Sequence, residues 1–507
     1  MVTSSTSSVV VSRAPWASLE VEWIFVPIAE REPAAAVEPF DRAAGGQLSQ
    51  ALGAGEFKAK AYEVYVVPVV EAGWTARRIA FVGVGPGTQA DAERVRRVAT
   101  AAALAGRQRG VGRLAFVSRQ RFDASAPVLS AAVRARAITD GLVSALFDGG
   151  RYKTSDNEAW TPQLVLSLSE DDGAAAEVDA AARRGRVLAE SANAARELVN
   201  EPGNRLRPEE FAARAAALAA AADLRVEVVE DDRLVDLGMG LLLGVGRGSE
   251  QPPRLLVVRY QPAAASRGPV LGLVGKGVTF DTGGISIKPS QGMERMKDDM
   301  AGGAAVVAAL TAIARLQAPV PVIGVVPIAE NMPSGHAIRP GDVIRGASGK
   351  TVEVLDTDAE GRLILADALW YVRHLGATHV VDIATLTGSC VVALGHTTSG
   401  LFGRPTEWVN TVHDVAAAAG DRVWPMPVFD DYKEQLRSDI ADLKNVGGRP
   451  GGAITAAVFL GEFAGDEPWA HLDVAGTAWN DEAKPYLPKG PTGVGVRTLT
   501  ELAFTRL

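Results

Sequence analysis

The stretch KGVTFDTGGISIKPSQGMERMKDD, from Lys276 to Asp299, concentrates acids, bases and glycines between two strongly apolar segments. The strand-like run LGLV precedes it, and the helical pattern MAGGAAVVAALTAIARL follows it. A second segment, DTDAEGR from Asp356 to Arg362, lies in the same way between VEVL and LILADALWYV. Sites of α/β proteins gather where strands end and helices begin, so the two segments predict a functional site. Turn residues in a solvated surface loop are the simpler alternative.

The pattern outside these segments predicts an α/β protein of two domains. At 507 residues the chain exceeds one hydrophobic core. The runs VEWIFVPI, YEVYVVPVV and RIAFVGVG, followed by the helical stretch AERVRRVATAAALAG, predict a smaller N-terminal α/β domain with a largely parallel sheet. From Leu255 onward the strands are continuously apolar, which indicates a central mixed sheet flanked by helices in a larger C-terminal domain, and the two acid-bearing segments make this the expected catalytic domain.

A long helical segment from about Glu170 to Asn200 is expected to connect the two domains, because its acids precede its arginines as the helix dipole prefers. We place the domains at residues 1–180, with the connecting helix at their end, and 181–507. The Ser/Thr-rich leader before the first strand is expected to be disordered. GVGPG at Gly83 to Gly87 lacks the full glycine spacing of a dinucleotide motif, so a strand-to-helix turn accounts for it.

Composition excludes several classes of function. The net charge of −8 provides no overall basic footprint, so nucleic acid is not an expected partner. The start of the chain lacks the pattern of a secretory signal, and no run of about 18 apolar residues predicts a membrane span. The single cysteine, Cys390, cannot form a disulfide within the chain and lies in an apolar run, where inert packing is expected. A cytoplasmic location is therefore expected.

Four acids in the two segments suggest a metal centre. Asp281 closes the run KGVTFD before a Thr-Gly-Gly turn, and Asp358 and Glu360 are two residues apart, which in an extended segment points both carboxylates to one side. Asp299 precedes a helical run, and capping that helix is its simpler interpretation. Oxygen-rich clusters suit hard or borderline divalent cations, and two such ions would balance the four negative charges. Without metal the acids would repel one another and raise their own pKa values.

Other hydrolytic motifs are absent from the sequence. Its six histidines form no HExxH motif and none lies beside the acids, which argues against a single-zinc protease. No GxSxG motif is present, which argues against a serine hydrolase. A two-metal phosphate hydrolase is a weaker alternative, because phosphate sites usually contain more arginine or an amide-rich loop.

Several segments resemble the signatures of the leucyl (cytosol) aminopeptidase family of two-metal exopeptidases. They are KGVTFDTGGISIK, MKDD, DTDAEGRL, ATLTG, DLKNVGGRPGGAITAAVFLGEF, WAHLDVAGTAW and YLPKGPTG, and the resemblance covers roughly residues 180–507. The family pattern implies that Asp281 and Glu360 bridge two divalent ions, Zn²⁺ or Mn²⁺. It implies that Asp358 completes one ion site and that Asp299 with the neutral amine of Lys276 completes the other.

The same resemblance implies the remaining roles. Lys288 would hold the scissile carbonyl oxygen as charge develops on it, and Arg362 would position a bicarbonate that acts as general base. The substrate would be a peptide or amide with leucine or another apolar residue at its N-terminus, cleaved by a metal-activated water. The implied side-chain pocket consists of small or apolar residues, namely Met296, Thr385, Gly388, Ala475 and Ala478. Family members are typically hexamers, so a homohexamer is expected.

One position departs from the family pattern. Asp356 stands where the family usually has asparagine, and an additional carboxylate near the metals leaves metal preference and pH optimum open. A non-catalytic scaffold or nucleic-acid-binding regulator on the same fold is the alternative function. The intact set of acids, lysines and arginine argues against it.

Overall fold

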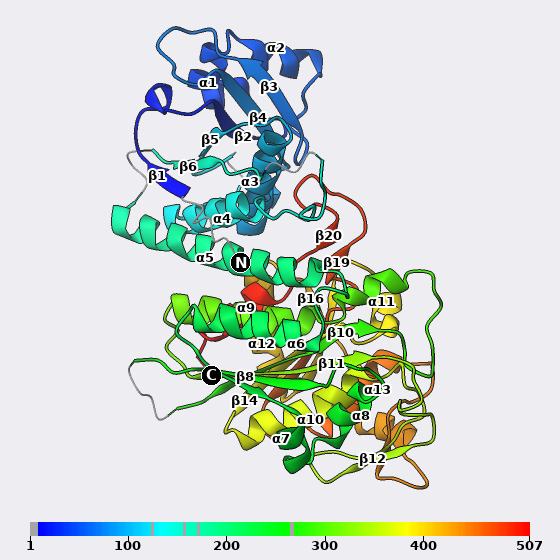
Figure 1. Ribbon diagram of the computed structural model, residues 1–507. Helices are drawn as coiled ribbons and strands as arrows, with labels where there is room; N and C mark the ends of the chain where they lie inside the picture. Colours follow the sequence, from blue (N-terminus) through cyan, green and yellow to red (C-terminus); the bar gives the residue numbers. More distant parts are fainter. Residues whose placement is uncertain (1–8, 123–125, 156–158, 170–172, 264–267, 507) are drawn as a thin grey trace. The chain divides into compact units, whose positions relative to one another are not determined.

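The computed structural model describes residues 9–122, 126–155, 159–169, 173–263 and 268–506 (Figure 1). The chain forms two compact units. The N-terminal unit comprises Met1–Asn193 together with Glu482–Lys489, and the catalytic unit comprises Ala194–Asp481 together with Gly490–Leu507. The division falls inside the long helix α5 (Ala175–Asn200), which also contains residue 180. Residues 170–172, where the connecting helix was expected to begin, lie outside the described residues.

The N-terminal unit is built on one sheet in the order β1-β6-β5-β2-β4-β3. Its strands are parallel except for β3, which is antiparallel to β4, so the prediction of a largely parallel sheet is correct. The strands are β1 (Val9–Ser12), β2 (Trp23–Ala29), β3 (Val64–Pro68), β4 (Arg78–Gly85), β5 (Arg113–Val117) and β6 (Gln163–Ser167), and the helices before α5 are α1 (Glu38–Ala43), α2 (Gln47–Ala54), α3 (Ala92–Arg107) and α4 (Ala131–Ser144).

Alternating side chains of these strands build one apolar core on each face of the sheet. On β2, Phe25 packs with α3 and α4, whereas Ile24 and Val26 pack on the opposite face with α1 and α2. This period of two is expected for a strand that is covered on both sides. Residues 1–8 of the leader lie outside the described residues, but Val9–Ser12 pairs with β6, so the expectation of disorder was wrong for this part of the leader.

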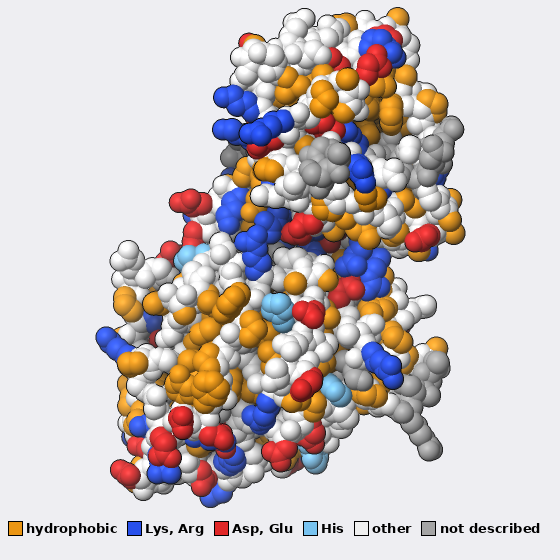
Figure 2. Space-filling model, turned by 180° about the vertical axis from the view of Figure 1, so that it is seen from behind, with side chains coloured by type: hydrophobic (Ala, Val, Ile, Leu, Met, Phe, Trp, Pro, Cys, Tyr) orange, Lys and Arg blue, Asp and Glu red, His pale blue; other side chains and the backbone are white. Residues whose placement is uncertain are grey.

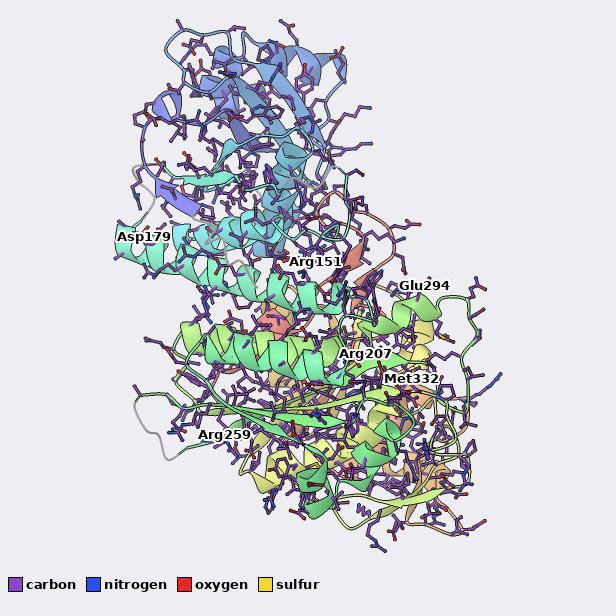
Figure 3. All side chains as sticks on the ribbon, in the orientation of Figure 1. Arg151, Asp179, Arg207, Arg259, Glu294 and Met332 are labelled. Carbon is purple, nitrogen blue, oxygen red and sulfur yellow. The ribbon has the colours of Figure 1, made fainter. Side chains whose placement is uncertain are left out.

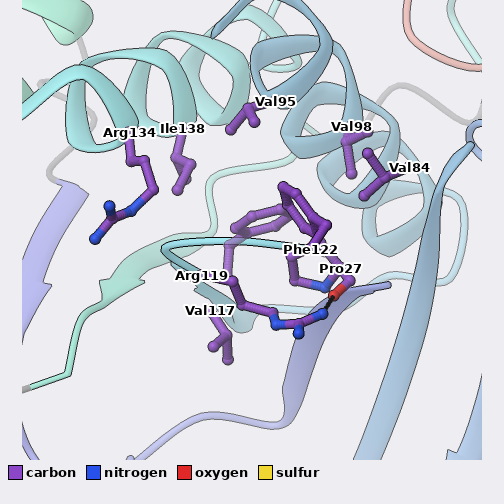
Figure 4. A pocket seen from close by; sticks show the side chains of 10 residues that line it. Pro27, Val84, Val95, Val98, Val117, Arg119, Phe122, Arg134 and Ile138 are labelled. Carbon is purple, nitrogen blue, oxygen red and sulfur yellow. Dashed lines mark hydrogen bonds between the residues drawn. The ribbon is translucent and has the colours of Figure 1, made fainter. Parts of the chain in front are cut away.

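A small pocket of about 10 Å³ lies in the N-terminal unit, at the carboxyl ends of β2, β4 and β5 (Figure 4). Its lining is apolar apart from Arg119 and Arg134. Both guanidinium groups are already engaged by the protein, since Arg119 pairs with Glu32 and Arg134 donates to the Ser118 hydroxyl at 2.9 Å. The residues that frame this pocket therefore offer no free polar group to a ligand.

The catalytic unit is built on a mixed sheet in the order β16-β15-β18-β14-β9-β11-β8-β7, with β10 paired to β11. The strands are β7 (Arg225–Val229), β8 (Arg254–Tyr260), β9 (Leu271–Gly275), β10 (Gly277–Asp281), β11 (Val322–Asn331), β14 (His379–Ala384), β15 (Ser399–Arg404), β16 (Val423–Pro425) and β18 (Trp469–Asp473). The shorter strands are β12 (Val343–Arg345), β13 (Thr351–Glu353), β17 (Leu443–Lys444), β19 (Trp479–Asn480) and β20 (Gly490–Pro491).

Helices cover both faces of this sheet (Figure 1), as the sequence predicted. The helices α6 (Pro208–Ala220), α9 (Ala301–Arg315), α12 (Thr406–Ala419) and α14 (Val496–Leu502) form one layer, and α7 (Asp231–Asp236), α8 (Gly240–Gly246), α10 (Gly361–His374) and α13 (Gly452–Gly461) lie in the other. The short helices α11 (Gly388–Leu394), η4 (Met293–Asp298) and η5 (Asp430–Leu436) lie in connections. No helix in the described part of the chain is long and apolar enough to cross a membrane.

Small residues allow α9 to approach the sheet very closely. A Cβ atom added at Gly302 would lie 2.1 Å from the Ile383 carbonyl oxygen, and one added at Gly275 would lie 2.4 Å from the Gly302 carbonyl oxygen. Contacts below 3.0 Å to backbone atoms cannot be accommodated without movement. The glycines of the helical run MAGGAAVV are therefore needed where α9 meets the ends of β9 and β14.

Candidate active site

The candidate site lies at one edge of the catalytic sheet, because five neighbouring strands run in the same direction. The strands β10, β11, β9, β14 and β18 are mutually parallel along the sheet, so their carboxyl ends lie at one edge. Lys276 follows β9, Asp281 ends β10 and Thr385 follows β14. In Figure 3, Met332 marks the end of β11 at this edge, and Glu294 marks helix η4. Ligands of open α/β sheets bind at such carboxyl edges.

Lys276 joins two of the predicted metal ligands. Its Nζ lies 2.7 Å from Asp299 Oδ1 and 2.9 Å from Glu360 Oε1, and it donates a hydrogen bond of 3.0 Å to the Thr385 carbonyl. Burial works against its charge, but the Asp299 and Glu360 carboxylates outweigh burial and hold the pKa of Lys276 above its usual value. A Cβ at Gly361 would lie 2.7 Å from Nζ, so a larger residue there would displace the end of this lysine from its present position.

Lys288 joins the other two carboxylates. Its Nζ lies 2.8 Å from Asp281 Oδ2 and is also paired with Asp358 Oδ1. Burial lowers and the Asp281 charge raises the pKa of Lys288, and the net effect is a pKa above its usual value. Asp281 Oδ1 accepts two further bonds of 2.8 Å, from the Gly283 amide and from Asn331 Nδ2. The Asp281 carboxylate is therefore fixed in orientation from three directions.

The acids form one cluster whose buried oxygens are not all satisfied. Ligand oxygens of Asp281, Asp358 and Glu360 lie within 4.8 Å of one another. Among the described residues, Asp299 Oδ2 and Glu360 Oε2 are buried without a hydrogen-bond partner. Burial raises the pKa of Asp299, Asp358 and Glu360, and the Asp281 charge adds to the rise at Glu360. Buried carboxylate oxygens that lack donors are the ligands that divalent cations accept, so this donor set fits such ions.

The structure corrects two local interpretations from the sequence. Asp299 does not cap α9, whose N-cap is Met300, and its carboxylate instead faces Lys276 and the Thr385 hydroxyl at 2.8 Å. Asp358 lies in a turn and Glu360 has helical dihedral angles, so the two carboxylates do not converge through the alternation of an extended strand. The turn leading into α10 brings them together.

Arg362, in the first turn of α10, lies among the charges of the cluster. It is 7% exposed, and its Nη1 donates a bond of 2.8 Å to the Asn445 carbonyl. Burial lowers the pKa of Arg362 to about 10, and the charges of Glu360 and Asp356 act in the opposite direction. Within the described part of the chain its Nε is buried without a partner. This guanidinium can therefore bind an anion by donating a hydrogen bond from Nε.

Sequence reasoning missed two asparagines that hold the site. Asn331, 2% exposed, donates from Nδ2 both to Asp281 and, at 3.0 Å, to the Thr357 carbonyl. Asn445 is fully buried, accepts from the Leu355 amide at 2.8 Å and donates to the Asp356 carbonyl at 2.6 Å. A fully buried amide must be satisfied by hydrogen bonds. Asn331 ends the apolar run VIGVVPIAEN and Asn445 follows the short strand β17, so a polar residue at the end of a strand is the sequence signal that could have found them.

The Asp356 side chain stabilises the turn that precedes α10 through one oxygen. Its Oδ1 accepts a bond of 2.9 Å from the Asp358 amide, and its own amide and carbonyl are bound by the Asn445 side chain. An asparagine oxygen could accept the same bond, so the departure from the family pattern preserves the shape of this turn.

The five predicted pocket residues come from three segments. Met296 is a half-buried residue of η4, Thr385 and Gly388 flank the start of α11, and Ala475 and Ala478 follow β18. Thr385 contacts the carboxylate cluster through Asp299 and Lys276. Hydrogen bonds and ion pairs of the described residues do not connect Met296, Gly388 or Ala478 directly to the carboxylates.

The α/β fold and a buried cluster of carboxylates, lysines and arginine define a metal-dependent hydrolase. Comparison with known families then identifies it more narrowly. Residues 193–500 match the catalytic domain of the cytosol aminopeptidase family, and residues 25–156 match the N-terminal domain of that family. The chain belongs to the cytosol aminopeptidase family and is an aminopeptidase, which acts on peptide substrates.

Individual relatives agree with this assignment along the whole chain. A probable cytosol aminopeptidase of Solibacter usitatus is 47% identical over 98% of this chain and 99% of the relative, and one of Koribacter versatilis is 47% identical over 85% and 86%. Among solved structures, the bottromycin maturation enzyme BotP in complex with Mn has a TM-score of 0.83 and 37% identity, covering 96% of this chain and 99% of BotP. A mutant of tomato leucine aminopeptidase has a TM-score of 0.87 and 31% identity, covering 98% and 96%.

Proposed function

We propose that this aminopeptidase removes N-terminal leucine or other apolar residues from peptides and amides with two divalent ions, Zn²⁺ or Mn²⁺, in each subunit. The observation that carries the metal centre is the pair of buried, unpartnered oxygens at Asp299 Oδ2 and Glu360 Oε2. Lys276 contacts only Oδ1 of Asp299 and Oε1 of Glu360, so the second buried oxygen of each carboxylate is left for a cation. A solved relative, BotP, has been described in complex with Mn.

In this proposal the five ligands divide between the two ions. Asp281 and Glu360 would hold both ions, Asp358 would complete one site, and Asp299 with Lys276 would complete the other. The position of Glu360 supports a bridging role, because its carboxylate is near both Asp358 and Asp281 and contacts Lys276 at 2.9 Å. When bound, the ions would supply Lewis acidity and a water acidified for attack on the peptide carbonyl.

Lys288 and Arg362 are proposed as the catalytic cations. The Lys288 ammonium is 21% exposed at the side chain, so it can face a substrate while its carboxylate neighbours keep it charged. Fixed positive charge of this kind stabilises an oxyanion best in a site that excludes water. Arg362 is proposed to orient a bicarbonate as general base, which the unpartnered Nε of this buried guanidinium supports.

The substrate pocket is proposed to consist of Met296, Thr385, Gly388, Ala475 and Ala478. Small side chains on both segments that follow β14 and β18 leave volume for an apolar side chain. The Thr385 hydroxyl donates to Asp299, so it is not a free donor for a substrate side chain. This arrangement favours leucine over polar residues at the substrate's N-terminus.

A homohexamer in the cytoplasm is proposed for the assembly and location, with domains at 1–180 and 181–507. Figure 2 shows apolar side chains gathered on the face of the catalytic unit in that view. Several large apolar residues of this unit are exposed, including Val392 at 89% and Phe429 at 63%. Contiguous exposed apolar surface is typical of protein–protein contact.

The test is hydrolysis of a series of amino-acid amides by protein that has been stripped with a chelator and then given Zn²⁺, Mn²⁺ or Co²⁺ singly. We expect no activity after chelation, recovery with at least one ion, and faster release of leucine than of glycine or aspartate. Lys288→Ala should abolish turnover while the variant still binds metal. Equal activity with and without chelator would overturn the metal centre. A salt-dependent gel shift together with absent peptidase activity would favour a nucleic-acid-binding regulator instead.

A further inference from the structure

Asp473 is a buried carboxylate that has no role in the proposed aminopeptidase chemistry. It is the last residue of β18 and is fully buried. The strand pairs in parallel with β14, with Asp473 opposite Ala384, so the segments after the two strands leave the sheet side by side. The first segment carries Thr385 and Gly388, and the second carries Ala475 and Ala478.

Three donors from these two segments converge on the Asp473 carboxylate. Its Oδ1 accepts bonds from the Leu386 amide at 3.3 Å and the Ala475 amide at 3.2 Å, and its Oδ2 accepts from the Thr387 hydroxyl at 2.7 Å. The Thr387 hydroxyl also accepts from the Cys390 amide at 3.0 Å, which directs its proton toward Asp473. Asp473 therefore binds both segments at once.

The chemistry of this position requires a carboxylate. An amide side chain has one acceptor oxygen and a donor NH₂ group, whereas a carboxylate accepts on both oxygens. Asparagine would thus leave either the Thr387 proton or the two backbone amides without an acceptor. Among the described residues Asp473 forms no direct ion pair, and the Arg362 charge acts on it from a longer distance, so hydrogen bonds provide all of its close polar contacts. A buried carboxylate is costly unless hydrogen-bond donors satisfy its oxygens, and here those donors come from the two segments.

We propose that Asp473 is a specificity-determining positioning residue that sets the separation between the two walls of the substrate side-chain pocket. The inference rests on the proposed pocket, because four of the five pocket residues lie on the segments that Asp473 joins. Asp473 does not touch the substrate. It acts by holding the backbone at Leu386, Thr387 and Ala475, and so determines how closely an apolar side chain is enclosed.

The test compares kcat and KM for leucyl and alanyl amides in the metal-loaded enzyme. Asp473→Asn and Thr387→Val should each lower the leucyl-to-alanyl ratio of kcat/KM about tenfold, mainly through a higher KM for the leucyl amide. This is the scale at which a hydrophobic pocket discriminates one or a few methylene groups. Bound metal, measured by elemental analysis, should stay unchanged. Thr387→Ser, which keeps the hydroxyl, should retain the wild-type ratio.

Ser399→Ala is the matched control. It removes a bond of 2.7 Å between Ser399 and Thr477, so it loosens the second segment without affecting its link to the first. This variant should keep the wild-type ratio.

An Asp473→Asn enzyme that loses activity equally on both amides, or that keeps the wild-type ratio, would overturn the role of Asp473. If Asp473→Asn does not fold, Thr387→Val against Thr387→Ser decides in the same way. A wild-type enzyme that does not discriminate between the amides would instead overturn the proposed pocket.

Discussion

Glu360→Gln tests the metal centre most directly, because it removes one charge and keeps the shape of the side chain. In the metal-free protein, Lys276 retains Asp299 at 2.7 Å when the Glu360 charge is lost. Burial and then the charge of Asp281 already raise the pKa of Glu360, so its loss also relieves repulsion. The glutamine oxygen can still accept from Lys276, and Asp299 remains its charged partner, so we expect the metal-free variant to lose less than the ~3–5 kcal/mol that removing one partner of a buried ion pair costs.

The difference in stability between Glu360→Gln and wild type should increase when metal is added. An ion that binds only the folded state at one hundred times its Kd stabilises that state by about 2.7 kcal/mol. Loss of a shared ligand is expected to weaken metal binding by about 100-fold. Loss of a residue that only hydrogen-bonds to a metal ligand already costs ~10–100-fold in metal affinity. At the same ion concentration the stabilisation would then fall to about 0.4 kcal/mol. At about 2 °C per kcal/mol for a unit of this size, the metal-dependent rise in Tm should shrink by roughly 5 °C.

The assay is thermal unfolding with and without Mn²⁺ or Zn²⁺, together with leucyl amide hydrolysis. Glu353→Gln is the control, because this half-buried glutamate on β13 accepts from Ser438 and is not part of the cluster. It should show the full metal-dependent rise and full activity. A Glu360→Gln variant that gains as much Tm from metal as wild type would refute the assignment of Glu360 as a ligand.

Three further predictions concern residues near or below the site. Asp356→Asn should leave the pH-rate profile unchanged, because its oxygen still accepts from the Asp358 amide, and a shifted profile would contradict this. Burial raises the pKa of Asp367 to about 7, so the folded protein keeps a proton that the unfolded chain releases between about pH 4 and 7, and stability falls as pH rises through that window. Denaturant unfolding should show that Asp367→Asn gains up to about 4 kcal/mol relative to wild type between pH 4 and 8, whereas a constant difference would disprove the shift. Burial raises the pKa of the Cys390 thiol to about 12, so it should not react with a disulfide reagent at pH 8 until the protein is unfolded, and rapid reaction of the folded protein would exclude this.

The amino-acid sequence by itself determined the α/β class, most of the strands and helices, and the two segments that carry the acids. Local periodicity is sufficient for this, because the apolar runs that form β9, β11 and β14 can be recognised as strands without knowing which strands they pair with. The same periodicity misled where a turn replaced a strand, at Asp358 and Glu360. The role of Lys276 as a ligand came from the family resemblance, because spacing does not imply a neutral lysine.

Only the tertiary structure decided which residues serve these acids. Asn331 and Asp473 are far apart in sequence, and they meet the site because the order β18-β14-β9-β11 brings the ends of parallel strands to one edge. Asn445 reaches the site from the end of β17, in the small sheet β12-β13-β17. The close approach of Gly361 to Lys276 likewise depends on how α10 packs against the sheet. Strand order and helix packing result from long-range burial of apolar surface, which no local stretch of sequence encodes.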